Sequence, residues 1–347
     1  MHISEIATLP LSEMRRLAQM TGNTPVEKVP LLINGVQRTI HLKLEGTNPT
    51  GSAKDRTAKG LMQALEAQGG MDQKSVIVES TSGNLGVALS FLCRAREYQF
   101  VAVVDPKTTC ENIEKMRALG AEINLVEEPD QSGGYLLSRL ERVHTLCQST
   151  PSSVWPNQYE NMANPTIHYT DTGPEIYRQM NGEVDAIFIA VSTGGTLAGI
   201  SRFFREVSAK TRIIGVDAQG SSVFGTPPGP RLLTGIGSSR RSSFLTRADY
   251  EEYILINDGQ AFAFCRALSR ATNIHVGGSS GAVLAACAHY LQVHPEAEHV
   301  VCLCADGGTN YSSSIYDDRW MLRHGFPLSA GTPEFFQILE RAPTHSW

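Results

Sequence analysis

The chain has 347 residues, of which 41% are hydrophobic and 19% are charged, and its formal net charge is −5. This composition is ordinary for a globular protein of about two domains, and the acidic balance argues against nucleic acid or an anionic membrane as a partner. No run of about 18 apolar residues predicts a transmembrane helix. The seven cysteines are scattered and the first 20 residues lack the pattern of a signal peptide, so we expect a reducing, cytoplasmic setting.

Strands and helices alternate through most of the chain. Short apolar runs rich in β-branched residues predict strands, and segments with helical periodicity lie between them. Continuous apolar strands separated by helices are typical of parallel sheets with helices on both faces. The predicted strands lie at 75–80, 100–106, 122–129, 186–192, 212–218 and 299–306.

Two details support this assignment. Gly120 follows the helical segment that begins near Cys110, in the position of a C-cap. Cys302 and Cys304 alternate within the last strand, which is typical of one face of a buried strand. Because no second Cys or His pair lies at zinc spacing, we expect no metal site.

Two irregular stretches interrupt the pattern. The first, near residue 160, predicts a domain boundary. The second, residues 225–243, is the longest stretch without periodicity. Long loops in compact domains are often functional. The arginines of this loop, Arg231, Arg240 and Arg241, fit a binding site and a solvated surface equally well.

Three glycine-rich loops precede helical segments, at 79–86, 191–199 and 275–286. Such loops aim free backbone N–H groups at one spot and so favour an anion. Each loop alone is also typical of an ordinary connection before a helix, because Ser and Thr are common N-caps and glycine is common in turns. Three of them, none matching the dinucleotide fingerprint, predict a site for a ligand with two anionic ends.

Lys54 follows a tight turn, 48–53, at the start of a predicted helix. Most lysines are solvated charges, but a helix N-terminus disfavours an ammonium group and lowers its pKa. A lysine of lowered pKa attacks carbonyl carbons and is a candidate for a Schiff base. A Schiff-base lysine together with a phosphate-binding loop indicates pyridoxal 5′-phosphate as the cofactor.

Over nearly its whole length the chain resembles the pyridoxal-phosphate enzymes of the cysteine synthase and cystathionine β-synthase family, known as fold type II. Several motifs occur in the family's order and spacing, which makes the signal stronger than any lone motif. They lie at 21–29, 43–56, 79–86, 157–159, 172–176, 191–201 and 277–282.

The resemblance implies a role for each matching position. Lys54 is the expected Schiff-base lysine and carrier of the proton at Cα. Asn84 is expected beside the 3-hydroxyl of the cofactor, and Ser279 beside its pyridine nitrogen. The cofactor phosphate is expected at Ser192, Thr193, Gly194, Gly195 and Thr196. The α-carboxylate of the amino acid is expected at Ser80, Thr81, Ser82 and Gln158.

The family also implies a fold with two parallel-sheet α/β domains and the cofactor in the cleft between them. We expect a smaller mobile domain over 51–161, which closes on the substrate. A larger domain is expected over 1–50 and 162–330, with a C-terminal tail over 331–347. The family further implies a homodimer.

Within the family, the chain departs from ordinary cysteine synthases, which usually have glycine at the position of Ser192. Four stretches, 103–107, 126–143, 215–225 and 312–320, resemble the branch that joins O-phospho-L-serine to L-glutamate. The expected activity is thus a transferase, a β-substituted alanine synthase, that makes N-(2-amino-2-carboxyethyl)-L-glutamate. This branch supplies 2,3-diaminopropionate for siderophores and peptide antibiotics.

A phosphate leaving group favours a guanidinium partner, and Arg139 is the candidate, with hydroxyl donors from Tyr159 and Ser192. From the pattern alone, a surface charge of its helix is the better interpretation of Arg139, and only the resemblance makes the phosphate role an equal alternative. Other activities stay open: a cysteine synthase that uses O-acetylserine or O-phosphoserine with sulfide, and a dehydratase. The set Lys54, Asn84 and Ser279 argues against a catalytically silent member that only binds a ligand or a partner protein. The absence of the dinucleotide fingerprint argues against a plain nucleotide-binding protein.

Overall fold

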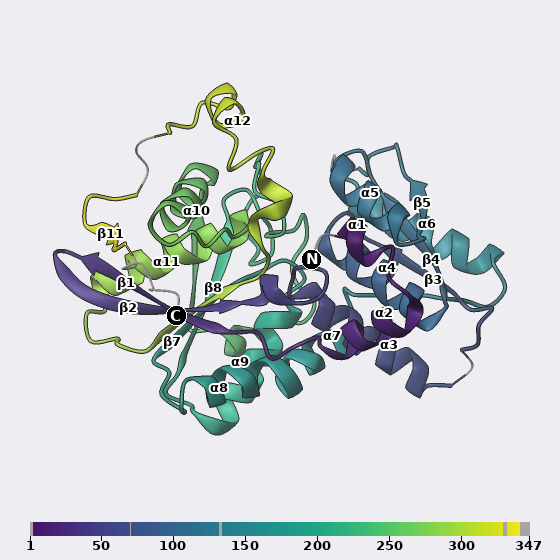
Figure 1. Ribbon diagram of the computed structural model, residues 1–347, viewed down its shortest axis with the longest axis horizontal. Helices are drawn as coiled ribbons and strands as arrows, with labels where there is room; N and C mark the ends of the chain where they lie inside the picture. Colours follow the sequence, from purple (N-terminus) through teal and green to yellow (C-terminus); the bar gives the residue numbers. More distant parts are fainter. Residues whose placement is uncertain (1–2, 70, 132–133, 329–331, 341–347) are drawn as a thin grey trace. The chain divides into compact units, whose positions relative to one another are not determined.

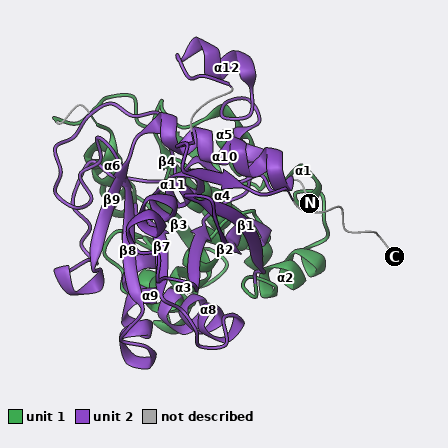
Figure 2. Cartoon of the chain, turned by 90° about the vertical axis from the view of Figure 1, so that its left-hand side faces the viewer, with its two compact units in different colours: residues 1–23, 48–167 green, residues 24–47, 168–347 purple. Residues whose placement is uncertain are grey.

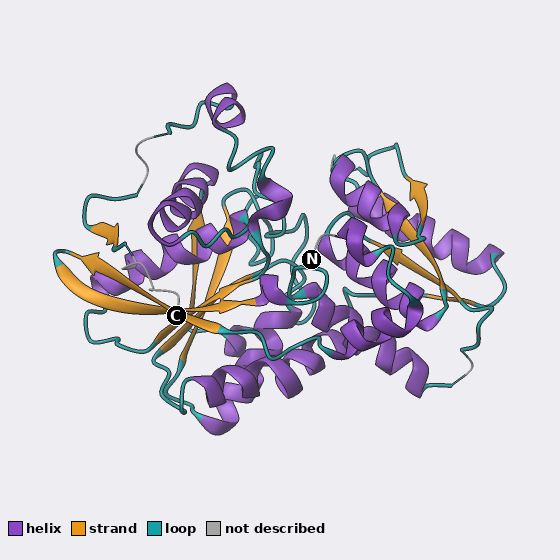
Figure 3. Ribbon diagram, viewed as in Figure 1, coloured by secondary structure: helices purple, strands orange, loops and turns teal. Residues whose placement is uncertain are grey.

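The computed structural model describes residues 3–69, 71–131, 134–328 and 332–340. The chain forms two compact units (Figure 2): unit 1 contains residues 1–23 and 48–167, and unit 2 contains residues 24–47 and 168–347. Each unit combines a sheet with helices (Figures 1 and 3), so the prediction of two α/β domains with parallel sheets is confirmed. Among the described residues, no helix is both long and apolar enough to cross a bilayer.

Unit 1 is built on a four-stranded parallel sheet with the strand order β5-β4-β3-β6. Successive strand residues point to opposite faces, so Ile77 lies in an apolar cluster with α4 and Val78 in another with α6. The strands are β3 (Val76–Ser80), β4 (Gln99–Val104), β5 (Glu122–Leu125) and β6 (Ser153–Val154). The helices are α1 (Ile3–Ile6), α2 (Leu11–Gln19), α3 (Lys54–Ala67), α4 (Asn84–Arg96), α5 (Cys110–Ala118), α6 (Leu136–Ser149) and α7 (Ala163–Ile167).

The bounds of unit 1 differ from the expected smaller domain at both ends. The N-terminal residues belong to unit 1 and not to the larger domain, because Ile3, Ile6 and Met14 are buried in the same apolar cluster as α4. The unit also continues to residue 167, because α7 packs on α3. A Cβ at Gly60 would lie 2.8 Å from Ile167 Cβ, so the glycine permits this close approach.

Unit 2 contains a seven-stranded mixed sheet with the order β11-β1-β2-β10-β7-β8-β9. The five strands from β2 to β9 run parallel, whereas β1 is antiparallel to both of its neighbours. Cys302 and Cys304 are buried in β10, as predicted. The strands are β1 (Val26–Ile33), β2 (Val36–Leu44), β7 (Ala186–Ala190), β8 (Arg212–Ala218), β9 (Glu252–Ile256), β10 (Val300–Cys304) and β11 (Phe336–Ile338).

The helices of unit 2 cover this sheet, and α11 is buried along almost its whole length. The α-helices are α8 (Gly173–Gln179), α9 (Gly195–Val207), α10 (Asp258–Thr272), α11 (Gly278–Val293) and α12 (Asp318–Arg323). The shorter turns are η1 (Glu45–Thr47), η2 (His168–Thr172), η3 (Arg247–Asp249) and η4 (Gly308–Tyr311). The stretch 225–243 contains no helix or strand, in agreement with the sequence analysis.

The expected C-terminal tail is in part a strand. Phe336 and Ile338 are buried on either side of the exposed Gln337, and this alternation places β11 beside β1. Within the described residues 332–340, the expected tail thus adds one strand to the sheet of unit 2. Residue 331 and residues 341–347 lie outside the described part of the chain, as do residues 132–133 within the stretch 126–143.

Candidate functional site

Lys54 is the first residue of α3 in unit 1, as the sequence predicts. The turn before it is tied to the helix by Asp55. The Asp55 carboxylate accepts hydrogen bonds from the backbone N–H of Thr50 at 3.0 Å and from its hydroxyl at 2.8 Å. The Lys54 N–H itself donates to Ser52 Oγ at 3.2 Å. These local bonds fix the point at which the Lys54 side chain leaves the backbone.

The carboxyl end of β3 leads directly into α4. Ser80 is the last residue of the strand and Asn84 is the first residue of the helix, with Thr81 and Ser82 between them. The N-cap of α4 is Gly83, which has no side chain to cap the helix. A helix N-terminus is a favourable place for an anionic group, because its N–H groups and the helix dipole both attract negative charge.

Gln158 lies beside Ser80, although 78 residues separate them in the sequence. The Gln158 side-chain amide donates to the Ser80 carbonyl oxygen at 2.8 Å, and Gln158 is 5% exposed. Tyr159 follows directly in the same segment. The structure thus brings together the loop after β3 and the segment that contains Gln158 and Tyr159, as the expected grip on an α-carboxylate requires.

Arg139 is buried rather than a surface charge of α6. The residue is 7% exposed, and its Nε lies 3.3 Å from Oδ2 of the buried Asp105, which follows β4. Its Nη1 is also buried and finds no hydrogen-bond partner among the residues that the structure describes. A buried guanidinium with an unused donor is costly unless a ligand or water satisfies it.

The phosphate-binding loop expected at 192–196 connects β7 with α9 in unit 2. Gly194 is the N-cap of α9 and has φ 94°, a left-handed conformation that glycine adopts readily. A Cβ at this position would lie 2.1 Å from Ser242 Oγ, which donates to the Thr193 carbonyl oxygen at 2.6 Å. The Ser192 hydroxyl donates to the Gly237 carbonyl oxygen at 3.2 Å. The loop is therefore held by the irregular stretch 225–243.

Ser279 and the three loop arginines also belong to unit 2. Ser279 lies in the first turn of α11 and is 1% exposed. Arg231 donates to the Gly220 carbonyl oxygen at 3.1 Å, which gives it a local structural partner. Arg241 lies against Gly225, where a Cβ would meet its Nη2 at 2.2 Å. The backbone N–H of Arg240 donates to Ser238 Oγ at 3.3 Å.

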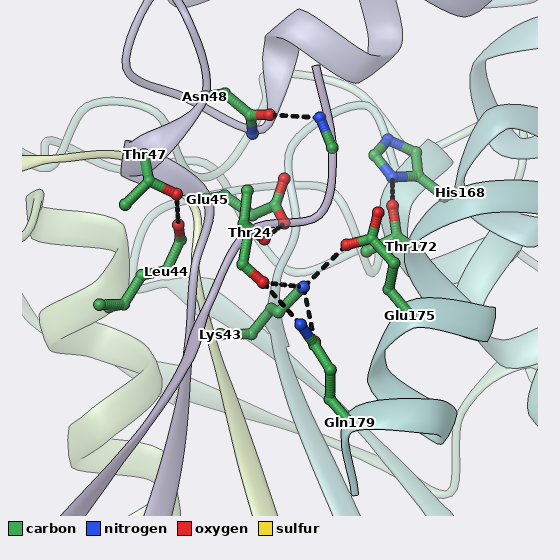
Figure 4. Close-up of polar contacts among 11 residues, drawn as sticks. Thr24, Lys43, Leu44, Glu45, Thr47, Asn48, His168, Thr172, Glu175 and Gln179 are labelled. Atoms are coloured by element: carbon green, nitrogen blue, oxygen red, sulfur yellow. Dashed lines mark hydrogen bonds and ion pairs between the residues drawn. The ribbon is translucent and has the colours of Figure 1, made fainter. Parts of the chain in front are cut away.

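Sequence reasoning missed two buried ionic groups. Glu79 is the only charged residue in the apolar run at 75–80, and that contrast is a usable signal. Lys43 is fully buried in unit 2. Its Nζ donates to the Thr24 carbonyl oxygen at 2.6 Å, and to Glu175 Oε2 and Gln179 Oε1, each at 2.8 Å (Figure 4).

Thr196, the last residue of the loop 192–196, also contacts a residue that no sequence pattern singles out. Its Oγ1 lies 3.1 Å from Nε2 of the fully buried His168. The other ring nitrogen of His168 lies 2.9 Å from Thr172 Oγ1 (Figure 4). The end of the loop is thus anchored to the η2 turn.

The comparisons with known proteins agree with one another. A family model described as pyridoxal-phosphate dependent enzyme matches residues 17–306. An N-(2-amino-2-carboxyethyl)-L-glutamate synthase of Ralstonia nicotianae is 39% identical over 92% of this chain and 96% of its own length. The synthase of the same name from Cupriavidus metallidurans is 38% identical over 88% and 91%. The O-acetylserine dependent cystathionine β-synthase of Helicobacter pylori is 32% identical, with a TM-score of 0.80, over 87% of this chain and 98% of that one.

Proposed function

Because the chain belongs to the family of pyridoxal-phosphate dependent enzymes, its cofactor is pyridoxal 5′-phosphate, and we propose that it joins O-phospho-L-serine to L-glutamate. The products are N-(2-amino-2-carboxyethyl)-L-glutamate and phosphate. One observation carries the proposal: two relatives with this product in their names match the chain over 92% and 88% of its length.

The residues of unit 2 fit the cofactor. The left-handed Gly194 and the N-terminus of α9 form a loop that suits a phosphate, because backbone N–H groups at a helix N-terminus bind anions. A side chain at Gly194 would displace Ser242 and fill this loop. The buried Ser279 hydroxyl supplies a neutral partner for a pyridine nitrogen.

Each chain residue then has a defined task. The bound cofactor supplies an electron sink for the negative charge that develops at Cα. Lys54 holds the cofactor covalently and moves the proton at Cα, while the loop 80–82 and Gln158 hold the α-carboxylate. Because the Ser279 hydroxyl does not keep the pyridine nitrogen protonated as a carboxylate would, the sink is weaker. This favours loss of a β-leaving group over transamination or racemisation.

Arg139 is the proposed partner of the phosphate leaving group. Its buried Nη1 supports this assignment, because a guanidinium donates charge-assisted hydrogen bonds to phosphate. We expect Arg139→Gln to lower kcat/KM for O-phospho-L-serine about 10- to 100-fold, the loss of one or two such bonds. The value for O-acetyl-L-serine, whose leaving group has no phosphate, should change far less. Steady-state kinetics with each donor give kcat/KM for the variant and for the unchanged chain.

The matched control is Arg142→Gln, which removes an exposed arginine from the same helix. It should leave both values close to those of the unchanged chain. Damage to the fold lowers the rates with both donors together. An equal loss for the two donors in Arg139→Gln would therefore remove Arg139 from the phosphate site.

The product itself tests the proposed function. A single mixture contains the holoenzyme, O-phospho-L-serine, O-acetyl-L-serine, L-glutamate and sulfide, and mass spectrometry identifies the product. We expect a product in which the three-carbon unit of serine is joined to the glutamate nitrogen. This product should be absent when O-phospho-L-serine is left out of the mixture. Cysteine as the main product would establish the alternative, a cysteine synthase, which the likeness to the O-acetylserine dependent enzyme supports. Pyruvate would indicate a dehydratase.

We further propose that the protein is a cytoplasmic homodimer. Its product would supply 2,3-diaminopropionate for a siderophore or a peptide antibiotic. The seven free cysteines support a reducing compartment, and the resemblance of the motifs supports the dimer and the pathway. Light scattering during gel filtration should give about twice the 37.8 kDa of one chain. A mass of one chain would contradict the dimer without affecting the proposed reaction.

A further inference from the structure

The carboxylate of Glu79 joins two segments of unit 1. Its Oε1 accepts hydrogen bonds from the Ser80 backbone N–H at 2.8 Å and from the Trp155 indole N–H at 3.1 Å. Its Oε2 accepts from the Gln158 backbone N–H at 3.1 Å. Glu79 is fully buried, so water does not compete for these donors. The start of the loop 80–82 and the segment 155–158 are thus tied to one carboxyl group.

Both segments carry residues that the proposed function assigns to the substrate α-carboxylate. The Gln158 side chain donates to the Ser80 carbonyl oxygen at 2.8 Å, which closes a second link between the segments. Asn164 donates to the Gln158 carbonyl oxygen at 2.7 Å and holds the far side of this residue. Glu79 itself is fully buried, so we expect it to affect substrate binding through the residues it holds, Ser80 and Gln158.

We propose that Glu79 is a positioning residue whose ionised carboxylate holds the loop 80–82 and Gln158 in the arrangement that binds the substrate α-carboxylate. This inference rests on the proposed function for the assignment of those residues. The ionised form accepts all three hydrogen bonds most strongly, because its oxygens share the negative charge. A protonated carboxyl has one hydroxyl oxygen, which is a weaker acceptor and carries its own O–H. Protonation therefore weakens the bond from Gln158, or those from Ser80 and Trp155.

The surroundings of Glu79 make this switch accessible near neutral pH. Burial raises the pKa of Glu79 to about 7, while the hydrogen bonds from Trp155, Gln158 and Ser80 and the charge of Arg139 oppose the rise. The arrangement should therefore form as the pH rises through about 7. The titratable and charged groups around this network are Arg139 on α6 with its partner Asp105, Cys147 on α6, and His144, whose ring centroid lies 4.8 Å from that of Trp155.

Hydrogen exchange of the holoenzyme without substrate tests the positioning directly. Glu79→Gln mimics the protonated acid, because one oxygen becomes an NH₂ group. At pH 8 we expect amides in residues 80–83 and 155–160 of this variant to exchange about tenfold faster, as for one lost hydrogen bond. Residues 258–272 of α10 should be unchanged. Glu122→Gln, which alters an exposed carboxylate on β5, is the matched control. Unchanged exchange in both segments would overturn the proposal.

Binding of L-alanine, an amino acid with an α-carboxylate but no leaving group, separates this proposal from the proposed function. Calorimetry should give a Kd about tenfold higher for Glu79→Gln than for the unchanged holoenzyme. Faster exchange with an unchanged Kd would remove residues 80–82 and Gln158 from the carboxylate site and leave the positioning role intact. Loss of synthase activity with phosphoserine and glutamate, without faster exchange, would contradict the positioning role.

Hydrogen exchange of the unchanged chain at different pH values is an independent test, which does not require Glu79→Gln to fold. After correction for intrinsic chemical rates, protection of the two segments should fall as the pH is lowered through about 7. His144→Gln should keep this midpoint, which distinguishes Glu79 from the imidazole beside Trp155. Trp155→Phe, which removes only one donor, should weaken protection at pH 8. Protection that does not depend on pH between 6 and 8 would overturn the proposal.

Discussion

Lys54→Ala is expected to lower kcat about 10³-fold or more and to abolish covalent capture of the cofactor by borohydride. Lys54 starts α3, and the hydrogen bonds of Asp55 to Thr50 fix the point at which the Lys54 side chain leaves the backbone. In the proposed function, the variant loses the covalent link and the group that moves the proton at Cα, and proton transfer alone contributes about 10²–10⁴-fold. Initial rates and peptide mapping after borohydride reduction measure the two effects.

Lys74→Ala is the matched control, because Lys74 is an exposed lysine of the same unit. Its reduced protein should carry the cofactor on the peptide that contains Lys54. A cofactor that remains fixed to the polypeptide of Lys54→Ala would mean that another lysine forms the Schiff base. The assignment carried over from the family motif would then be wrong for this chain.

Lys43→Met should lower the free energy of unfolding by about 3–5 kcal/mol, the cost of breaking a buried ion pair. Lys43 is fully buried, and all three of its N–H donors are used, on Thr24, Glu175 and Gln179. The change leaves the Glu175 carboxylate buried without its counterion. Urea unfolding, followed by circular dichroism, measures the loss.

Two further variants make this prediction specific. Arg212→Met breaks an ion pair with Glu252 in the same unit, where both side chains are about two-fifths exposed and the pair is 3.8 Å apart, so it should cost less than about 1 kcal/mol. Lys43→Met combined with Glu175→Leu removes both charges and should recover much of the loss. A double variant less stable than Lys43→Met alone would show that the uncompensated Glu175 carboxylate is not the cause of the loss.

Much of the parallel framework could be predicted from the sequence, because buried parallel strands are continuous apolar runs. The runs at 75–80 and 299–306 became β3 and β10, and Gly120 has φ 90° just beyond α5. The hairpin of β1 and β2 was missed, although its two-residue turn, Asn34-Gly35, has positive φ at both positions and is a recognised hairpin signal.

The parts of the site that escaped prediction depend on tertiary contacts. Arg139 and Arg142 look alike on a helical pattern, yet only Arg139 meets Asp105 and is buried. The difference arises from how α6 packs on the sheet, which no local pattern contains. Glu79 likewise acquires its role from Gln158, 79 residues along the chain. Charges buried by partners far away in sequence are the residues that periodicity cannot assign.

The strand order of unit 2 has a consequence for synthesis on the ribosome. β10 lies between β2 and β7, although about 260 residues separate β2 from β10. All residues of unit 1 precede residue 168, so they have left the ribosome long before this central strand is made. In the nascent chain, the edge of β2 that pairs with β10 therefore stays unpaired until β10 has been translated. The centre of this sheet is therefore completed only near the end of synthesis.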